Sequence, residues 1–211
     1  MRKKVGLVLM ALGAVLICGA ALLLAYNRQE AQLAEDHVQF VLPQMEQQIR
    51  QAAETTPVET QPKAAEYVPV AFLTPEDVVM TESVINGYAY IGYLSIAELG
   101  LELPVMSQWD YTRLQIAPCR YSGTVKGENL VVMAHNYSSH FGRLKQLGLG
   151  SSVQFVDMDG KVWNYEVAAM DVLAAENVEE MTAGEYDLTL FTCAKNRTHR
   201  VTVRCNKIAE K

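Results

Sequence analysis

The sequence lacks the patterns that mark the commonest cofactor-dependent and metal-dependent proteins. It has no glycine-rich phosphate-binding pattern, no paired cysteines at zinc-binding spacing and no internal repeat. These absences remove the nucleotide-binding and zinc-finger interpretations. Positive charge is also scarce, because 18 lysines and arginines stand against 24 aspartates and glutamates. An acidic chain disfavours a polyanionic partner, so we expect it not to bind nucleic acid.

Charged residues are absent from one long stretch near the N-terminus. Residues Val5 to Tyr26 are rich in Leu, Ala and Val and carry no charge. A helix of this length spans roughly 33 Å, enough for a hydrocarbon core of about 30 Å, whereas the apolar part of a cleavable signal peptide usually runs about 7 to 15 residues. We therefore predict a single-pass anchor in the cell membrane, with cleavage as the alternative. The basic start Met1-Arg2-Lys3-Lys4 predicts a cytoplasmic N-terminus and an exported remainder.

The segment after the anchor changes composition twice. Residues 30–54 have helix-like chemistry interrupted by Pro43, which indicates a kinked stalk. Residues 55–69 hold three prolines among Thr, Glu, Gln and Ala, a composition typical of a semi-extended linker. The predicted division is a cytoplasmic tail at 1–4, the anchor at 5–26, the stalk and linker at 27–80, and a folded domain at 81–211.

The folded domain consists of short strand-like runs separated by turns. Seven such runs are Tyr90 to Ile96, Leu101 to Met106, Asn129 to Ala134, Ser152 to Asp157, Lys161 to Asp171, Asp187 to Thr192 and His199 to Arg204. Asp159-Gly160 predicts a tight hairpin between two of them. Short helices are expected near 109–116, 140–147 and 174–181. Seven or eight strands at this spacing favour a closed β-barrel or a sandwich over a parallel α/β sheet.

Three cysteines lie beyond the predicted anchor, namely Cys119, Cys193 and Cys205. An odd number in an exported domain is compatible with one disulfide and one free thiol. If Cys193 is the reactive one, Cys119 and Cys205 either pair or remain as two buried free thiols. Cys193 directly follows the strand-like run 187–192, and it can attack a carbonyl only as a thiolate with a base or positive charge nearby.

The candidate bases are few. His37 lies in the stalk, which leaves His135, His140 and His199. His135 follows an apolar strand whose end is a rigid place from which to aim an imidazole. A metal site that joins His135 to His140 is not expected, because a separation of five residues suits neither one helical face nor one strand face.

A positive partner for Cys193 is expected on the next strand. An antiparallel pairing of 187–192 with 199–204 would bring Arg200 toward Cys193, where a guanidinium favours a thiolate and donates hydrogen bonds to an oxyanion. Arg197 and Arg204 compete for this role. Arg200 and Arg204 share one face of the strand, so the register must decide between them.

Asp157 and Asp159 border the predicted hairpin. Two carboxylates there suggest a calcium site, but a solvated hairpin end is the favoured interpretation.

These residues occur in contexts that resemble the sortases, the membrane-anchored cysteine transpeptidases of Gram-positive cell surfaces. Thr189-Leu190-Phe191-Thr192-Cys193 matches the family's Thr-Leu-x-Thr-Cys signature, and Arg200 stands in a Thr-His-Arg context like that of the family's arginine. The runs 91–96 and 103–105 resemble the family's opening strands, and 129–136 resembles the strand that leads to its histidine. One departure is Ala134, which stands where many sortases have Gly.

The resemblance implies a mostly β domain at 81–211, a closed sortase-like barrel of about eight strands with short helices, that works without a cofactor. It also implies roles for three residues. Cys193 would attack a Thr-Gly-type bond in the C-terminal, LPxTG-like sorting signal of an exported protein, and His135 would protonate the leaving amine. Arg200 would hold the oxyanion or the substrate backbone.

An amine acceptor of the cell wall would then resolve the thioester. Two alternatives stay open: a pilin-polymerising sortase that uses a pilin lysine, and an exported binding module that does no chemistry. The binding module predicts a Cys193 that is buried or disulfide-bonded and inert.

Overall fold

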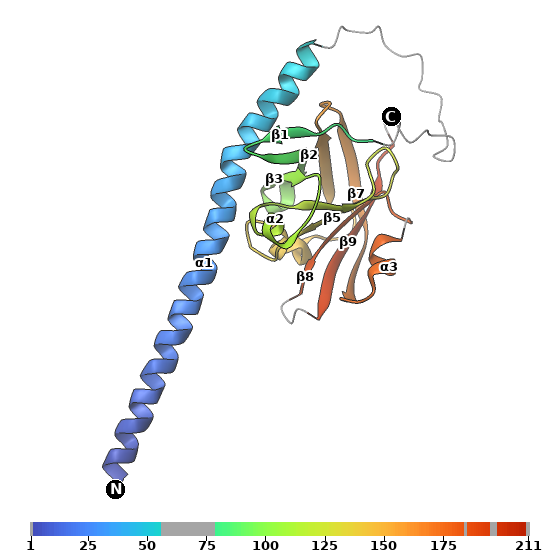
Figure 1. The fold of residues 1–211 in the computed structure, drawn as a ribbon. Coiled ribbons are helices and arrows are strands. Elements are labelled where there is room, and N and C mark those ends of the chain that lie inside the picture. Colours follow the sequence, from blue (N-terminus) through green and yellow to red (C-terminus); the bar gives the residue numbers. More distant parts are fainter. Residues whose placement is uncertain (1, 56–78, 184, 195–197, 210–211) are drawn as a thin grey trace.

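The computed structural model describes residues 2–55, 79–183, 185–194 and 198–209. In chain order its elements are α1 (Arg2–Thr55), β1 (Ser83–Ile85), β2 (Tyr88–Ile96), the 3-10 helix η2 (Ala97–Leu99), β3 (Leu101–Met106), α2 (Tyr111–Ile116), β4 (Cys119–Ser122), β5 (Leu130–Ala134), the 3-10 helix η3 (Phe141–Gln146), β6 (Ser152–Asp157), β7 (Val162–Ala174), α3 (Val178–Thr182), β8 (Leu188–Cys193) and β9 (His199–Lys207). Figure 1 shows a long helix beside a compact β domain.

Eight of the strands form a closed barrel. Their order is β2-β3-β4-β5-β8-β9-β7-β6, and β6 pairs back onto β2 to complete the circle, while β1 pairs antiparallel with the start of β2. Neighbouring strands are antiparallel except for β3 with β4 and β5 with β8. The prediction of a closed barrel of about eight strands with short helices is therefore confirmed.

The barrel closes at Gly92 of β2. This residue has φ of 142°, and the register of β2 against β3 shifts between Tyr90 and Gly92. A Cβ on Gly92 would lie 2.1 Å from the Val156 carbonyl oxygen of β6. Because a side chain at this position would collide with backbone, only glycine permits the close approach of β2 and β6.

The predicted strands agree with the structure to within a few residues, with two omissions. The Asp159-Gly160 hairpin is confirmed, since β6 and β7 are antiparallel and Gly160 has φ of 80°. The short strands β1 and β4 were not predicted. The helix expected over 174–181 is wrong in its first part, because β7 extends to Ala174 and α3 begins at Val178.

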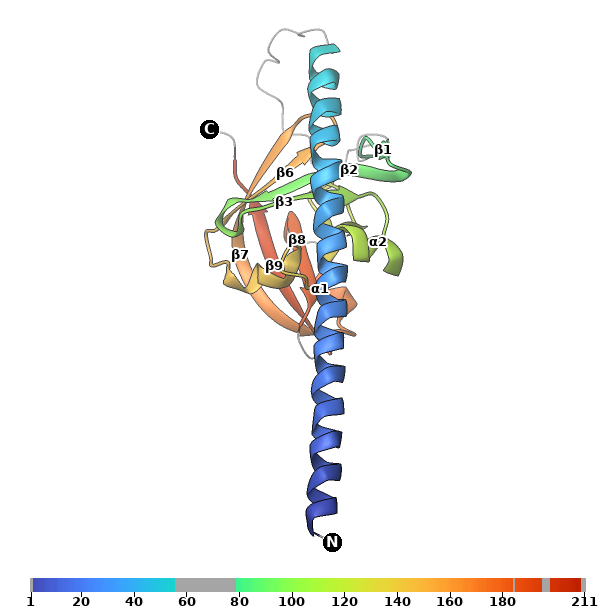
Figure 2. The same cartoon turned by 90° about the vertical axis from the view of Figure 1, so that its left-hand side faces the viewer.

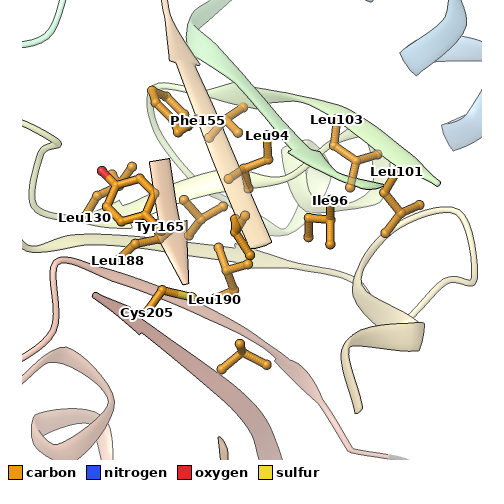
Figure 3. Packing of buried hydrophobic residues seen from close by; sticks show 14 of the residues in the cluster. Leu94, Ile96, Leu101, Leu103, Leu130, Phe155, Tyr165, Leu188, Leu190 and Cys205 are labelled. Carbon is orange, nitrogen blue, oxygen red and sulfur yellow. The ribbon is translucent and has the colours of Figure 1, made fainter. Parts of the chain in front are cut away.

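Apolar side chains from strands around the barrel fill its interior. Figure 3 shows Leu94 and Ile96 of β2, Leu103 of β3, Leu130 of β5, Phe155 of β6, Tyr165 of β7, Leu188 and Leu190 of β8 and Cys205 of β9 converging on one core. Inward residues alternate with outward ones along these strands, as the period of two requires. This packing fixes the positions of the strand ends, where the candidate site residues lie.

Helix α1 begins far from the barrel and ends against it. In both views its N-terminal part extends away from the β domain, and its C-terminal half runs along the side that carries β1, β3 and α2 (Figures 1 and 2). Its apolar window has a mean hydropathy of 2.0 and none of it is buried, so the helix is long and apolar enough to cross a membrane. This fits the predicted anchor; the domain limits 1–4, 5–26, 27–80 and 81–211 stay predictions.

One face of the C-terminal part of α1 packs on the barrel. The buried residues of this face are Ala34, Val38, Val41, Met45 and Ile49, which recur every three or four positions. The imidazole Nε2 of His37 lies 2.8 Å from the Tyr90 hydroxyl of β2. The C-terminal part of the helix is therefore attached to the domain along several turns.

Pro43 lies inside α1 without ending it. The sequence predicted helix-like chemistry interrupted at this residue, whereas the structure has one helix over residues 2–55. An internal proline removes one backbone hydrogen bond and crowds the carbonyl four residues earlier, at a cost of about 3 kcal/mol. Burial of the Val41 and Met45 side chains on the β domain stabilises the helix by a similar amount, about 1.5 to 3 kcal/mol for each side chain. The predicted linker falls mostly in 56–78, outside the described residues.

Candidate active site

Two parallel strands place the predicted cysteine and histidine side by side. Ala134 of β5 pairs with Thr192 of β8, and the buried Thr192 hydroxyl donates a hydrogen bond of 2.8 Å to the Ala134 carbonyl oxygen. His135 and Cys193 are the next residues along these two strands. Because the strands run in the same direction, both residues lie at the same end of the barrel.

The third predicted residue comes from the neighbouring strand on the other side of β8. Cys193 pairs directly with Arg200 in the antiparallel register of β8 and β9. His135, Cys193 and Arg200 line one pocket of about 230 Å³. The structure therefore brings all three predicted site residues into one cavity.

The three cysteines of the domain differ in their surroundings. Cys119 and Cys205 are fully buried in two separate core clusters, and both are free thiols. Burial raises the pKa of each of these two thiols to about 12. Cys193 is a free thiol that is only partly buried. Of the two alternatives for Cys119 and Cys205, the structure has two buried free thiols and no disulfide between them. Cys193 is the thiol that lines the pocket.

The strand register also separates the competing arginines. Arg204 pairs with Thr189, further along β9 than Arg200, and only 7% of its side chain is exposed. Its Nε lies 3.1 Å from a carboxylate oxygen of Asp171, an ion pair without hydrogen-bond alignment. Its Nη2 donates to the Glu180 carbonyl oxygen at 2.9 Å. Arg204 thus ties β9 to β7 and α3; Arg197 lies outside the described residues.

An aromatic wall of the pocket was not predicted. Trp109 stacks on Tyr121 with ring centroids 5.6 Å apart, and Tyr121 meets Phe191 edge-on at 5.4 Å. Tyr111 adds a further edge contact to Trp109. Asp110 accepts a hydrogen bond from the Arg113 amide as the N-cap of α2, the helix that begins with Tyr111.

A second part of the pocket lining is apolar. It is made of Ala175, Val178 and Met181, which lie in or next to α3. The site therefore combines a thiol, an imidazole and a guanidinium with aromatic and aliphatic side chains.

The other candidate histidines and the carboxylate of Asp157 do not line this pocket. His140 is fully buried, and its burial lowers its pKa to about 4. His199 has its Nδ1 2.9 Å from the Thr198 hydroxyl. The Asp157 carboxylate accepts hydrogen bonds from Trp163 and from two backbone amides of the hairpin. Among the residues that the structure describes, no group of three His, Cys, Asp or Glu could hold a metal ion.

Solved structures with the same fold are sortases. Sortase A from Corynebacterium diphtheriae matches with a TM-score of 0.53 and 22% identity, over 59% of this chain and 63% of that one. Sortase C1 from Streptococcus agalactiae matches with a TM-score of 0.52 and 20% identity, over 61% and 72%. A sortase D5 transpeptidase from Clostridium perfringens matches with a TM-score of 0.52 and 17% identity, over 60% and 83%. At these identities the likeness shows the fold, and the match spans less than two thirds of the Corynebacterium protein. A search of curated protein sequences gives no match.

The fold and the pocket define a barrel protein with a thiol, an imidazole and a guanidinium at one end of neighbouring strands. The sortase-domain family model matches residues 94–208, more than half of the chain. The chain therefore belongs to the sortase family. This membership supports a role as a cysteine transpeptidase.

Proposed function

We propose that this chain is a membrane-anchored sortase that transfers exported proteins from a C-terminal sorting signal to an amine acceptor of the cell wall. The observation that carries the proposal is the pairing of Cys193 with Arg200 in a pocket that His135 also lines. A partly buried, free thiol beside a guanidinium and an imidazole is the arrangement that a cysteine nucleophile requires. The partial exposure of Cys193 also counts against an inert binding module, which predicts a buried or bonded thiol.

In the first half-reaction the Cys193 thiolate attacks the carbonyl carbon of a Thr-Gly-type bond. The carbonyl oxygen becomes an oxyanion, and the Arg200 guanidinium donates hydrogen bonds to it. The carbon–nitrogen bond then breaks, and His135 gives its proton to the departing amine. A thioester on Cys193 and a free amino group on the released fragment result.

In the second half-reaction an acceptor amine attacks the thioester carbonyl. His135 takes up the proton of the attacking amine, and the carbon–sulfur bond breaks to return the Cys193 thiolate. The product is a new amide bond between the sorted protein and the acceptor. We propose a cell-wall peptide amine as the acceptor.

The long apolar helix suits an enzyme that works at the membrane surface. Arg2, Lys3 and Lys4 precede the apolar window of α1, and positive-inside bias then leaves the N-terminus in the cytoplasm. The barrel follows on the exported side. In this orientation the site meets exported proteins that are still held in the membrane.

The proposal is tested by mass spectrometry of Cys193 in the full chain. The protein, in detergent micelles, is incubated with a library of sorting-signal peptides, with and without amine acceptors. We expect a peptide-sized thioester on Cys193 that hydroxylamine removes, and a new amide product when an acceptor is present. Cys193→Ala should abolish both, whereas Cys18→Ala, which removes an exposed cysteine of the anchor, should leave both unchanged.

Arg200→Lys keeps the positive charge and removes the planar guanidinium group. An ammonium group cannot reproduce the planar fork of the guanidinium, so the rate of thioester formation should fall severely. No adduct on Cys193 with any peptide would overturn the proposed function. An adduct that forms as fast in Arg200→Lys would overturn only the role of Arg200.

A further inference from the structure

The loop after His135 is held tightly by its own backbone. The His135 carbonyl oxygen accepts a hydrogen bond from the Phe141 amide at 3.1 Å. The Tyr137 carbonyl oxygen accepts two, from the amides of His140 at 3.0 Å and Gly142 at 2.9 Å. These three bonds fold residues 135–142 into one compact turn, so the position of Tyr137 relative to His135 is fixed.

The aromatic rings of this turn are in contact with each other. The rings of His135 and Tyr137 are stacked, with centroids 4.8 Å apart and an interplanar angle of 19°. The Tyr137 ring also contacts His140, with centroids 5.5 Å apart. His140 is fully buried, and neither of its ring nitrogens has a hydrogen-bond partner among the residues that the structure describes. His140 therefore supports Tyr137 as a buried ring and not as part of a hydrogen-bond network.

Arg143 fastens the same turn to the rest of the barrel. Its Nε donates to the Ser138 carbonyl oxygen at 3.0 Å, and its Nη2 donates to the Leu99 carbonyl oxygen at 2.6 Å. Leu99 belongs to η2, which follows strand β2 of the barrel wall. The turn that carries His135, Tyr137 and His140 is thus attached to the barrel.

The Tyr137 side chain also faces helix α1. It lines a groove of about 360 Å³ together with Ala34 and His37 of α1 and Ile116 of α2. Tyr137 is half-buried there, and burial raises its pKa. The tyrosine therefore lies between the docked helix and the histidine of the active-site pocket.

We propose that Tyr137 is a positioning residue for His135, a ring held by the turn and by His140 that keeps the imidazole directed at Cys193. The inference rests on the proposed function, because it assigns His135 the proton transfers to and from the amines. A stacked ring restricts rotation of the imidazole without accepting its proton. The contribution of Tyr137 then lies in its aromatic face, and its hydroxyl is dispensable.

The test compares Tyr137→Phe with Tyr137→Leu in the full chain. Phenylalanine keeps the aromatic face, whereas leucine keeps only apolar volume. We expect Tyr137→Phe to retain activity within about twofold, and Tyr137→Leu to lower kcat by about 10- to 100-fold with little change in KM for the peptide, since misplacement of a reacting group slows the chemical step. Both variants should unfold at nearly the same temperature, which distinguishes positioning from a general loss of stability.

Proton NMR of the His135 ring gives a second readout. The stacked tyrosine produces a ring-current shift on the imidazole protons, which Tyr137→Phe should keep and Tyr137→Leu should lose. Equal kcat values in the two variants, with the shift lost only in Tyr137→Leu, would overturn the positioning role. Absence of a Cys193 thioester in the unmodified chain would instead overturn the proposed function, so the two failures are distinguishable.

Discussion

Met45→Ala tests whether helix α1 is part of the folded barrel domain. The Met45 side chain is fully buried, in the same cluster as Tyr90 of β2 and Met106 of β3. Truncation of a buried methionine to alanine removes its transfer free energy and leaves a cavity, at a cost of about 2 to 5 kcal/mol. Methionine and alanine are both good helix formers, so the helix itself is hardly affected. The cost should therefore appear as a loss of packing between α1 and the barrel.

The assay is thermal and chemical unfolding of the full chain in detergent micelles, followed by tryptophan fluorescence. The two tryptophans, Trp109 and Trp163, both lie in the β domain, so their fluorescence reports on the barrel. We expect Met45→Ala to lower the unfolding temperature by roughly 5 to 15 °C. The matched control is Phe40→Ala on the same helix, where the side chain is 57% exposed and the change should cost no more than about 0.5 kcal/mol.

The refuting result is specific. If Met45→Ala and Phe40→Ala unfold along the same curve, the buried face of α1 contributes nothing to the stability of the barrel. The packing of residues 34–49 would then be wrong, and α1 would be a free stalk.

Three further predictions concern the surroundings of the site. A Cβ at Gly142 would lie 2.3 Å from the Asn136 carbonyl oxygen, so Gly142→Ala should shift the turn that carries His135 and slow transpeptidation by about 100-fold. In the control Gly148→Ala the new Cβ meets no atom within 4 Å, so the rate should not change. Equal rates in the two variants would contradict the predicted role of the turn. Burial lowers the pKa of His140 from 6.5 to about 4 in the folded state, so between pH 6.5 and about pH 4 the unfolded chain binds more protons than the folded one. The free energy of unfolding should therefore decrease by up to about 3 kcal/mol as the pH falls through this range. Urea unfolding at several pH values should show a smaller decrease for His140→Phe. Arg204→Met removes the ion pair with Asp171 and the hydrogen bond to the Glu180 carbonyl oxygen, and a hydrogen bond of a charged group is worth about 1.5 to 3 kcal/mol. The change should loosen α3 and raise KM for the peptide while the alkylation rate of Cys193 stays unchanged; an unaltered KM would show that Arg204 does not hold the pocket wall.

Strands with a clear alternation of apolar and polar residues were predictable. Leu101–Met106 and Ser152–Asp157 have the predicted bounds, because each has an apolar side facing the core over its whole length. The strands β1 and β4 have three and four residues, too few for a period of two to be recognised. Their pairing depends on neighbours that are distant in the sequence, so only the folded barrel defines them.

The docked face of α1 was visible in the sequence only as helix-like chemistry. Val38, Val41, Met45 and Ile49 recur at helical spacing, but the pattern does not say what the face packs against. Pro43 also indicated an interruption, since the intrinsic preference of proline opposes a helix. Packing against β3, α2 and β1 overrides that preference here, and the sequence of α1 does not contain this information.

The ring stack at the histidine was likewise beyond the sequence. Residues two apart share a strand face and residues three apart share a helix face, so no single regular element brings His135, Tyr137 and His140 together. Their contact depends on the turn closed by the amides of Phe141 and Gly142. A turn of this kind has no simple residue signature, so its consequence for the imidazole emerges only from the structure.

The register between β8 and β9 decides which arginine lies beside Cys193, a question that the alternation of side chains along a strand leaves open. Arg200 and Arg204 lie on the same face of β9, and the sequence treats them alike. In the structure Cys193 pairs with Arg200, while Arg204 pairs with Thr189, four residues further along the strand. At about 3.3 Å per residue this separates the two positions by roughly 13 Å, well beyond the reach of one oxyanion. One arginine therefore lies at the open strand end beside the thiol, and the other, paired with Asp171, holds the wall of the same pocket.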